Sequence, residues 1–420
     1  MGRLIFHVDV NSAFLSWEAA YRLHHMGGQL DLRSIPSAVS GDMAARHGII
    51  LAKSVPAKKY GVKTGETIGE ARRKCPSLYM VPPNYGLYQR CSAAFVTVLR
   101  TYSPAVEQYS IDECFVDMSG IEAAERDPVR AADELRERIR RELGFTVNVG
   151  ISDNKLLAKM ASDFRKPDRT HTLFRREVPE KMWPLPVSDL FYVGHATARK
   201  LAGLGICTIG DLAHADPDLL RAQMGKQGEL IHAFANGADV SPVETEAPPQ
   251  KGYGNSTTIA FDVADASTAK LVLLALCETV GARLRRHRMA ARRISVGIRS
   301  FDLSYAGHQM QMPNATNITN ELHRYACQLF DELWDGRPIR HLGVSTGRLV
   351  TAQQSRQMEL FDHTDYRKLA LSDEAADRIR ARYGIDALRR ASFIGSRIDH
   401  MEGGISREKR DVDYTKQKID

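Results

Sequence analysis

The order of apolar segments in the first 151 residues constrains the fold of this chain more than any other feature. Apolar runs with the length of strands alternate with patterns that have helical spacing. The predicted order is a strand at 4–10, a helix at 12–23, two short strands within 106–118, a helix at 129–143 and a strand at 145–151. Strand–helix–strand–strand–helix–strand order is typical of a compact α/β sheet.

The remainder of the chain predicts further domains. After Pro167 the sequence is helical and rich in Ala and Leu up to 242, and 243–254 form a polar linker with Pro and Gly. A second α/β unit follows, with strands near 256–261, 292–301, 308–313 and 340–349 and helices at 266–288 and 316–334. Residues 351–420 are polar, with one amphipathic helix near 373–391 and disorder from Gly403 onward. We therefore expect an α/β multidomain protein.

Charge and cysteine usage narrow the function only slightly. The chain has 58 Lys and Arg against 51 Asp and Glu, and this net charge of +7 mildly favours a polyanionic partner. Its six cysteines form no CxxC pair, which argues against a zinc site and against a disulfide scaffold. Because we see no signal peptide and no apolar run of about 18 residues, we expect a cytoplasmic monomer without a membrane partner.

Three acidic residues lie at the edges of apolar strands. Asp9 ends the first strand, and Asp112 with Glu113 separates the apolar segments 109–111 and 114–116. A carboxylate in such a place is costly unless it faces water or binds a cation. Three hard oxygen ligands suit Mg²⁺, and two such ions about 3.5–4 Å apart can promote the attack of a hydroxyl on a phosphate. Asp112 and Glu113 can share one site only if the chain turns there, as at a hairpin tip; ordinary carboxylates that face water are the alternative.

Several motifs, in matching order, resemble those of Y-family DNA polymerases. They are His-Val-Asp-Val-Asn-Ser-Ala-Phe at 7–14, Tyr-Ser-Ile-Asp-Glu-Cys-Phe-Val-Asp at 109–117, Gly-Ile-Ser-Asp-Asn-Lys-Leu-Leu-Ala-Lys at 150–159, and Lys166-Pro167. The resemblance extends from residue 3 to about 349. It implies a palm at 1–18 and 78–166, fingers at 19–77, a helix-hairpin-helix thumb at 167–242, a linker at 243–254, a little finger at 255–350 and a C-terminal tail at 351–420.

This resemblance implies a low-fidelity, template-directed DNA polymerase that adds deoxynucleotides to a DNA 3′ end in translesion synthesis. Asp9 and Asp112 are then ligands of both Mg²⁺ ions, Glu113 binds the catalytic ion, and the backbone carbonyl of Val10 completes a metal shell. The chain departs from the family pattern at Asn11, where Asp is usual. Asn11 keeps an oxygen but loses a charge, so we expect a different local metal affinity without loss of catalysis.

The nucleotide pocket is expected to contain Phe14, Lys58 and Lys166. Phe14 resembles the steric gate of the family, a ring under the sugar that excludes a 2′-hydroxyl; a core residue of an amphipathic helix is the alternative. Lys166 is the implied contact to the phosphates. Lys58 stands where the fingers usually carry Arg, and Val55 stands where they usually carry Tyr. Lysine lacks the bidentate fork of arginine, and Val55 lacks a hydroxyl, so we predict weaker nucleotide binding than in an Arg/Tyr version.

Two segments are expected to bind DNA without reading its sequence. Residues 191–206 resemble a helix-hairpin-helix whose backbone N–H groups at Gly194 bind a phosphate, although Tyr192 replaces the first glycine of the usual Gly-x-Gly; a simple helical connection is the alternative. Residues 282–300 contain seven arginines and no acidic residue, a charge density that repels itself unless a polyanion is near. A solvated helix face is the alternative. The arginines predicted to contact DNA are Arg285, Arg286, Arg288, Arg292 and Arg293.

The polar tail contains a candidate partner peptide. Gln357, Leu360 and Phe361 resemble the clamp-binding peptide of bacterial DNA polymerases, and an exposed Leu-Phe pair requires a pocket. A sliding clamp is therefore an expected partner, beside primer-template DNA and deoxynucleoside triphosphates; packing on the tail's own helix is the alternative. Two other functions remain open. A nucleotide cyclase predicts no thumb, arginine-rich domain or clamp peptide, whereas a non-catalytic DNA-binding scaffold is compatible with Asn11 and Val55.

Overall fold

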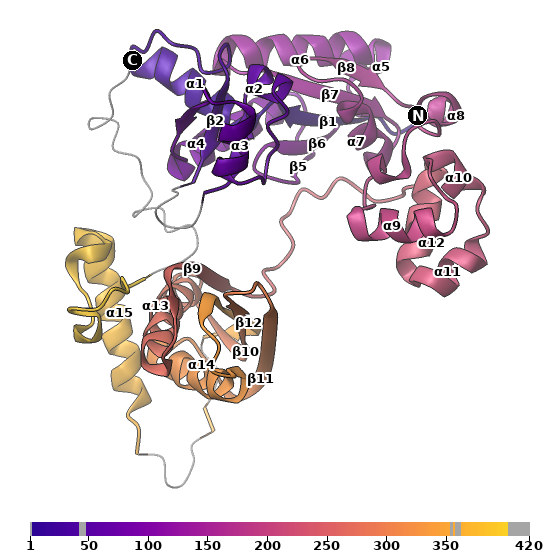
Figure 1. Cartoon of the computed structure of the whole chain (residues 1–420). Coiled ribbons are helices and arrows are strands. Elements are labelled where there is room, and N and C mark those ends of the chain that lie inside the picture. The colour runs from indigo at the N-terminus through magenta and orange to yellow at the C-terminus, as the bar shows by residue number, and fades with distance from the viewer. Residues whose placement is uncertain (1, 42–47, 353–355, 358–362, 402–420) are drawn as a thin grey trace.

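The computed structural model describes residues 2–41, 48–352, 356–357 and 363–401. They form three separate β-sheets with helices packed around them, which confirms the predicted α/β multidomain fold (Figure 1). Two of the sheets lie in the upper part of Figure 1, a helical segment lies beside them, and the third sheet lies below. In the described part of the chain, no helix has the length and apolar character needed to cross a bilayer.

The largest sheet has the strand order β5-β6-β1-β7-β8. Its strands are β1 (Ile5–Val10), β5 (Val106–Gln108), β6 (Glu113–Asp117), β7 (Val147–Ser152) and β8 (Thr170–Thr172). β8 pairs parallel to β7, and the other neighbours pair antiparallel. β1 is buried along its whole length because it lies in the middle of the sheet. The strands predicted near 4–10, 106–118 and 145–151 are confirmed.

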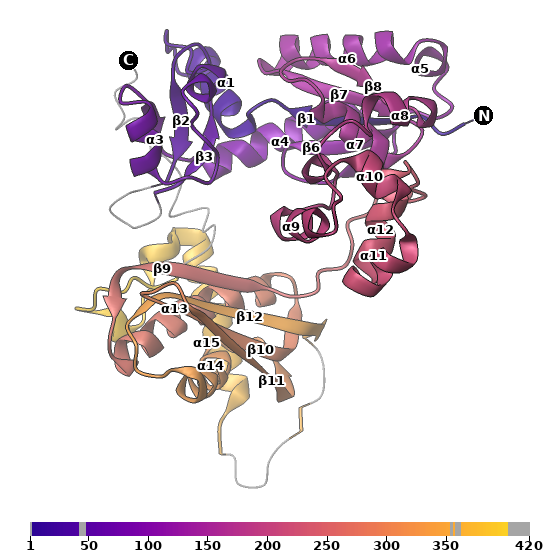
Figure 2. The same ribbon diagram turned by 45° about the vertical axis from the view of Figure 1, so that its right-hand side comes forward.

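Helices cover both faces of this sheet. The helices of this region include α4 (Tyr85–Arg100), α5 (Glu122–Arg126), α6 (Pro128–Leu143) and α7 (Lys155–Asp163). α4 and α6 share a core with Phe6 and Val149, whereas α7 packs on the opposite face (Figure 2). A Cβ at Gly150 would lie 2.0 Å from the carbonyl oxygen of Ala158. The close approach of α7 to β7 therefore requires glycine at this position.

A three-stranded sheet with the order β3-β2-β4 forms a smaller unit beside the first. Its elements are β2 (Ser37–Ser40), β3 (Ile50–Lys53), β4 (Tyr79–Val81), α2 (Val55–Lys59) and α3 (Ile68–Lys74), and α1 (Ala13–His25) leads into it. Ile50, Ala57 and Ile68 share its small core. The hydroxyl of Ser54 accepts a hydrogen bond from the backbone N–H of Ala57 at 3.1 Å and so caps α2 where this helix leaves β3.

The segment between the first sheet and the linker is helical, as predicted. It contains α8 (Val178–Lys181), α9 (His195–Gly203), α10 (Ile209–His214), α11 (Pro217–Met224) and α12 (Lys226–Ala235). Leu201, Ile209 and Ile231 are fully buried in its core, which Leu157 and Ala161 of α7 also join. The helices of this segment therefore pack against the helix that covers the first sheet.

The third sheet is antiparallel and has the order β11-β10-β12-β9. Its unit contains β9 (Gly254–Val263), α13 (Ala266–Arg286), β10 (Met289–Ser300), β11 (Tyr305–Thr316), α14 (Thr319–Leu333) and β12 (Ile339–Thr351). Both helices pack against the sheet in one core, to which Leu276, Ile294 and Phe330 contribute. The predicted order of strands and helices beyond the linker is confirmed.

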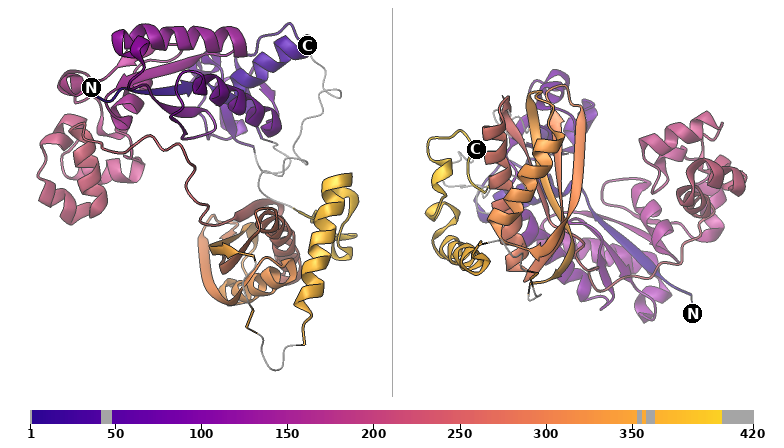
Figure 3. Two further views of the ribbon diagram at one scale, coloured as in Figure 1. Left: turned by 180° about the vertical axis from the view of Figure 1, so that it is seen from behind. Right: turned by 90° about the horizontal axis from the view of Figure 1, so that it is seen from below.

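Residues 366–401 pack on this third unit, which the sequence did not predict. α15 (Tyr366–Tyr383) begins before the predicted helix near 373–391 and lies on the helical side of the sheet (Figures 1 and 3). Phe393 and Ile398 join the core of the unit. Glu278 of α13 is only 2% exposed and pairs with Arg380 and Arg390, each at 3.0 Å. This part of the polar tail is therefore held by apolar contacts and by buried ion pairs.

Candidate active site

The carboxylates of Asp9 and Glu113 are brought together by strand pairing. Asp9 of β1 lies opposite Glu113 of β6 in the antiparallel register, so both side chains project from one face of the sheet. Asp112 precedes β6 in the turn that joins it to β5, and its carbonyl accepts a hydrogen bond from the Val10 N–H at 3.0 Å. The chain thus turns at the tip of a β5–β6 hairpin, as a shared site for all three acids requires.

Two lysines lie against these carboxylates. The Nζ atom of Lys159 is 2.5 Å from Oε1 of Glu113 and 3.6 Å from Oδ2 of Asp9. The Nζ atom of Lys166 is 3.0 Å from Oδ1 of Asp9, and Asp163 contacts both amines. Lys166 was singled out from the sequence, whereas Lys159 was quoted only as part of a motif. Its helical position on α7, one turn after Lys155, was the available signal.

The charge balance of the site indicates room for further cations. Burial raises the pKa of Glu113 to about 7, and the neighbouring Asp9 acts in the same direction, although Lys159 opposes both. Burial disfavours the charged form of Lys159, but Asp163, Glu113 and Asp9 outweigh it and raise the pKa of this amine. A buried carboxylate with a raised pKa gains from a divalent cation nearby. The oxygen-only donor set fits a hard ion such as Mg²⁺.

A cavity of about 540 Å³ opens beside the carboxylates, between the first sheet and the three-stranded unit. Six of the residues predicted for catalysis and nucleotide binding line it, namely Asp9, Val10, Phe14, Lys58, Asp112 and Lys166. Glu113 does not line it but lies behind Asp9 in the sheet. The predicted catalytic and nucleotide-binding residues therefore converge on one place, although they come from segments far apart in sequence.

Phe14 packs on the core and also lines the cavity. Its ring is stacked on Tyr88 with centroids 4.5 Å apart and an interplanar angle of 11°, and it meets Tyr85 edge-on at 6.1 Å. The side chain is only partly buried and forms part of the cavity wall. Packing on the core thus fixes the ring where it faces the cavity.

Lys53 is a second cation from the three-stranded unit, and it was not predicted from the sequence. Lys53 ends β3 and lines the cavity together with Lys58, and its amine donates a hydrogen bond to Thr64 Oγ1 at 3.1 Å. Burial lowers the pKa of Lys53, and the nearby charge of Lys58 lowers it further. Two amines that oppose each other's charge form a favourable place for an anion. Lys59 points to no such site and is exposed, as expected for a solvated residue.

Asn11 is buried in the cavity wall and is 7% exposed. Within the described residues, neither its side-chain oxygen nor its side-chain nitrogen has a hydrogen-bond partner. An aspartate here would bury one more negative charge beside Asp9, at a further cost in desolvation. The exchange of a charged for a neutral side chain is thus compatible with the local environment.

The backbone before α9 explains how Tyr192 replaces a glycine. Tyr192 has a positive φ of 71°, a left-handed conformation that glycine adopts more readily, and its carbonyl accepts a hydrogen bond from Gln227 at 3.1 Å. Gly194 then precedes the first turn of α9, and a Cβ there would meet nothing within 4 Å. The first turn of α9 follows an exposed residue, so its N–H groups are positioned for an external acceptor.

The arginine-rich segment divides into two groups, and one prediction needs correction. Arg285 is not free of acidic neighbours: it pairs with Asp377 at 2.6 Å and with Asp373 at 3.2 Å, both on α15. Because its side chain is 8% exposed, Arg285 holds α15 rather than a polyanion. The acids were invisible in the sequence because they lie about 90 residues away. The exposed arginines are Arg286, Arg288, Arg293 and Arg299, and Arg292 is partly buried.

The predicted clamp peptide lies mostly outside the described residues. Leu360 and Phe361 are outside them, so their prediction stays untested. Gln357 is exposed and exchanges two hydrogen bonds with Asn314 through its backbone, at 2.8 and 2.9 Å. Just before it, the Arg356 guanidinium pairs with Glu321 of α14 at 2.5 Å. The start of this segment is thus fixed on the third unit.

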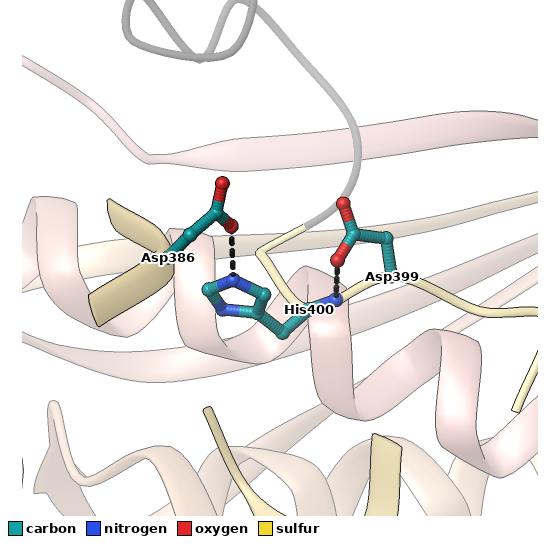
Figure 4. A group of neighbouring side chains, drawn as sticks. All are labelled: Asp386, Asp399 and His400. Atoms are coloured by element: carbon teal, nitrogen blue, oxygen red, sulfur yellow. Dashed lines mark hydrogen bonds and ion pairs between the residues drawn. The ribbon is translucent and has the colours of Figure 1, made fainter. Parts of the chain in front are cut away.

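A second cluster of ionisable groups lies at the end of the C-terminal segment (Figure 4). The Nε2 atom of His400 is 2.8 Å from Oδ1 of Asp386, and the His400 N–H donates to Asp399 at 2.8 Å. Arg389 pairs with both carboxylates, at 3.0 and 3.8 Å. Because the Arg389 guanidinium already supplies positive charge to both carboxylates, we interpret the cluster as a structural contact within the C-terminal segment and not as a metal site.

The chain is similar to known proteins over most of its length. Residues 8–163 match the impB/mucB/samB family, 250–360 match its C-terminal domain and 175–206 match the IMS family HHH motif. DNA polymerase IV of Clostridium acetobutylicum is 43% identical over 394 residues, 94% of this chain and 99% of that protein. DNA polymerase IV 1 of Bacillus subtilis is 36% identical, over 93% of each chain.

A solved structure supports the same fold. A chimeric Y-family DNA polymerase, named Dbh-Dpo4(243-245)-Dbh, superimposes with a TM-score of 0.72 and covers 83% of this chain and 99% of its own, at 22% sequence identity. This likeness concerns the fold alone, whereas the family matches and the curated relatives extend over most of the sequence. The chain therefore belongs to the impB/mucB/samB family and, as its motifs predicted, to the Y-family DNA polymerases.

Proposed function

We propose that this chain is a DNA-directed DNA polymerase that extends primers on template DNA with low fidelity and acts in translesion synthesis. The observation that carries the proposal is the convergence of Asp9, Asp112, Phe14, Lys58 and Lys166 on one cavity. A nucleotide cyclase would not need the helix-hairpin-helix segment or the third unit, both of which match the family. A cytoplasmic site of action belongs to the proposal.

For the chemical step we propose two Mg²⁺ ions as cofactor. Asp9 and Asp112 would hold both ions, Glu113 the catalytic one, and the Val10 carbonyl would complete a shell. When bound, such a pair activates the primer 3′-hydroxyl and neutralises the departing pyrophosphate. Lys159 keeps Glu113 and Asp9 close together while the site is charged, through the contacts at 2.5 and 3.6 Å.

We propose that Lys53, Lys58 and Lys166 bind the triphosphate. All three line the cavity, and phosphate oxygens accept charge-assisted hydrogen bonds from amines. Removal of one such bond costs about 1.5–3 kcal/mol, so Lys53→Met should raise the KM for deoxynucleotides about tenfold or more. Lys59→Met is the matched control and should change little. An unchanged KM for Lys53→Met would exclude its contact with the nucleotide.

A second substitution tests the effect of having lysine at position 58, where the family usually has arginine. An arginine can bind a phosphate through two parallel N–H groups, so Lys58→Arg should lower the apparent Kd for the nucleotide. The assay for this apparent Kd is pre-steady-state single-nucleotide insertion, which separates nucleotide binding from the chemical step. No gain in affinity would show that the fork of arginine has no partner here.

We propose that DNA lies against Gly194 and against Arg286, Arg288, Arg292 and Arg293. Neutralisation of three of these arginines should flatten the salt dependence of DNA binding without a change in base preference. An unchanged salt slope would refute the surface. Asn11 and Val55 keep a non-catalytic scaffold as the second candidate, and only measured primer extension separates the two.

A sliding clamp is the further partner that we propose, bound through Gln357, Leu360 and Phe361. Deletion of 357–361 should shorten the products made per binding event in the presence of the clamp while single-nucleotide insertion stays normal. Because Gln357 bonds to Asn314 through its backbone, the side chain of Gln357 is left for such a partner. Equal product lengths with and without the peptide would contradict clamp binding.

A further inference from the structure

The segment that follows α12 does not leave the molecule at once but runs along the first sheet. We call residues 237–244 the linker strap. Its carbonyls and side chains bind the N-terminal end of α7: the Gly237 carbonyl accepts from Asn154 at 3.1 Å, and Asp239 accepts from the Leu156 N–H at 3.1 Å. Arg3 donates to the Ser241 carbonyl at 2.8 Å. The strap is thus fixed at nearly every second residue.

The strap ends at an ion pair of the first sheet. The amine of Lys155, on α7, donates to both carboxylate oxygens of Glu107, on β5, at 2.7 and 2.8 Å. The same amine donates to the Pro242 carbonyl at 3.2 Å, and Glu107 accepts from the Glu244 N–H at 2.7 Å. Both side chains of the pair are largely buried, at 13% and 15% exposure. The Lys155–Glu107 pair therefore holds the strap at both Pro242 and Glu244.

An apolar contact completes this anchor. Val243 packs against Ile5, Phe115 and Ala158, which form a small core on the α7 face of the sheet. The Lys155 amine lies 4.9 Å from the centroid of the Phe115 ring. Phe115 lies two residues after Glu113 and opposite Glu107 in the β5–β6 register. The anchor is thus built on the hairpin whose tip carries the catalytic acids.

The other end of the linker is fixed on the third unit. Tyr253 is 4% exposed, and its carbonyl accepts a hydrogen bond from the Thr346 N–H at 2.7 Å. Gly252 approaches β12 so closely that a Cβ would lie 2.1 Å from the Thr346 carbonyl oxygen. Between the two anchors only residues 245–251 remain, with two consecutive prolines at 248 and 249.

We propose that Glu107 and Lys155 are positioning residues that set the reach of the third unit from the active site. The proposal rests on the polymerase function, because the third unit must hold DNA while the first sheet carries out the reaction. The seven residues 245–251 span at most about 24 Å, whereas release of the strap back to 238 would give fourteen residues and about 48 Å. Doubling the free length lowers the effective concentration of the third unit at bound DNA about threefold.

The test compares two variants that open the strap from opposite sides. Glu107→Ala removes the acceptor for Lys155 and Glu244, and Val243→Asn weakens the strap from the linker itself, where no sheet residue changes. Glu134→Ala is the matched control, since Glu134 pairs with Arg130 in an exposed ion pair on α6. Each protein is assayed for primer extension over a range of primer-template concentrations and for its radius of gyration without DNA by small-angle scattering.

We expect both strap variants to raise the KM for primer-template up to about threefold, with kcat unchanged, because only the tether is altered. Their radius of gyration should increase, and Glu134→Ala should match the wild type in every measurement. Glu107→Gln keeps an acceptor for the Glu244 N–H, so its KM and its radius of gyration should lie between those of the wild type and those of Glu107→Ala. A wild-type radius and KM for both strap variants would overturn the proposal, and so would a fall in kcat at constant KM. Because scattering requires no activity, its result stands even if the polymerase function is refuted.

Discussion

Two neighbouring arginines, Arg285 and Arg286, should have opposite functions although the sequence presents them alike. Arg285 is 8% exposed and donates to Asp377, to Asp373 and to the Asn317 carbonyl. Arg286 is exposed. We predict that Arg285→Ala destabilises the third unit and leaves DNA binding unchanged, whereas Arg286→Ala weakens DNA binding and leaves stability unchanged.

The magnitude for Arg285→Ala follows from its contacts. Removal of one partner of a buried ion pair costs about 3–5 kcal/mol, because the other charge stays buried without compensation. Asp373 would still accept from the Thr319 N–H at 2.7 Å and pair with Arg390 at 3.3 Å, so the lower end, about 3 kcal/mol, applies. For a domain of about 150–250 residues this corresponds to a fall in Tm of about 6–12 °C.

Scanning calorimetry and salt-dependent DNA binding measure the two effects separately. Arg286→Ala should change Tm little, since exposed substitutions cost within about 0.5 kcal/mol, and should reduce the slope of log Kd against log salt by about 1. Arg285→Ala should show the reverse pattern. A reduced salt slope for Arg285→Ala with an unchanged Tm would refute the assignment of Arg285 to the anchor of α15.

Three further outcomes follow from single positions. Phe14→Ala should reduce discrimination against ribonucleotides about 10–200-fold in single-nucleotide insertion, and unchanged discrimination would exclude Phe14 as the sugar contact. Gly150→Ala should cost about 1–3 kcal/mol or more by urea unfolding, because its Cβ meets α7, whereas Gly69→Ala, in open space on α3, should stabilise the protein slightly. Burial lowers the pKa of His323 in the folded protein. As the pH falls below about 6.5, the unfolded chain therefore takes up a proton that the folded protein does not, and the free energy of unfolding should decrease. His323→Gln should flatten that pH dependence, and an unaltered slope would contradict it.

The strands that carry the carboxylates could be predicted from the sequence because their determinants are local. Asp112 and Glu113 alternate in direction along any regular strand, so a shared site required a turn between two short strands, and β5 and β6 form that hairpin. The apolar run before Asp9 predicted a buried strand, and in the structure antiparallel pairing places Asp9 opposite Glu113. Strand geometry left ordinary carboxylates that face water as an alternative, and the resemblance of the motifs at 7–14 and 109–117 to those of Y-family DNA polymerases favoured the shared site.

Long-range packing explains what the sequence did not predict. The residues after 365 are polar, and Phe393 and Ile398 lie beyond the amphipathic helix predicted near 373–391, without a periodic pattern that indicates a buried face. Glu278 finds Arg380 across 102 residues and Arg390 across 112. The charge pattern along the chain therefore could not show that Asp373 and Asp377 pair with Arg285. Lys53 was missed for a similar reason, because its place in the cavity depends on how β3 meets the first sheet.

We propose that Asp9, Asp112 and Glu113 gather the metal ions that join a nucleotide to a primer. The most direct test is primer extension with Mg²⁺ by Asp112→Asn, with Asp117→Asn at the far end of β6 as the matched control. Loss of one charged group that stabilises the transition state costs at least about 100-fold, so Asp112→Asn should be that much slower while Asp117→Asn keeps the wild-type rate. Extension by Asp112→Asn at the wild-type rate would show that Asp112 does not hold the catalytic metal ions.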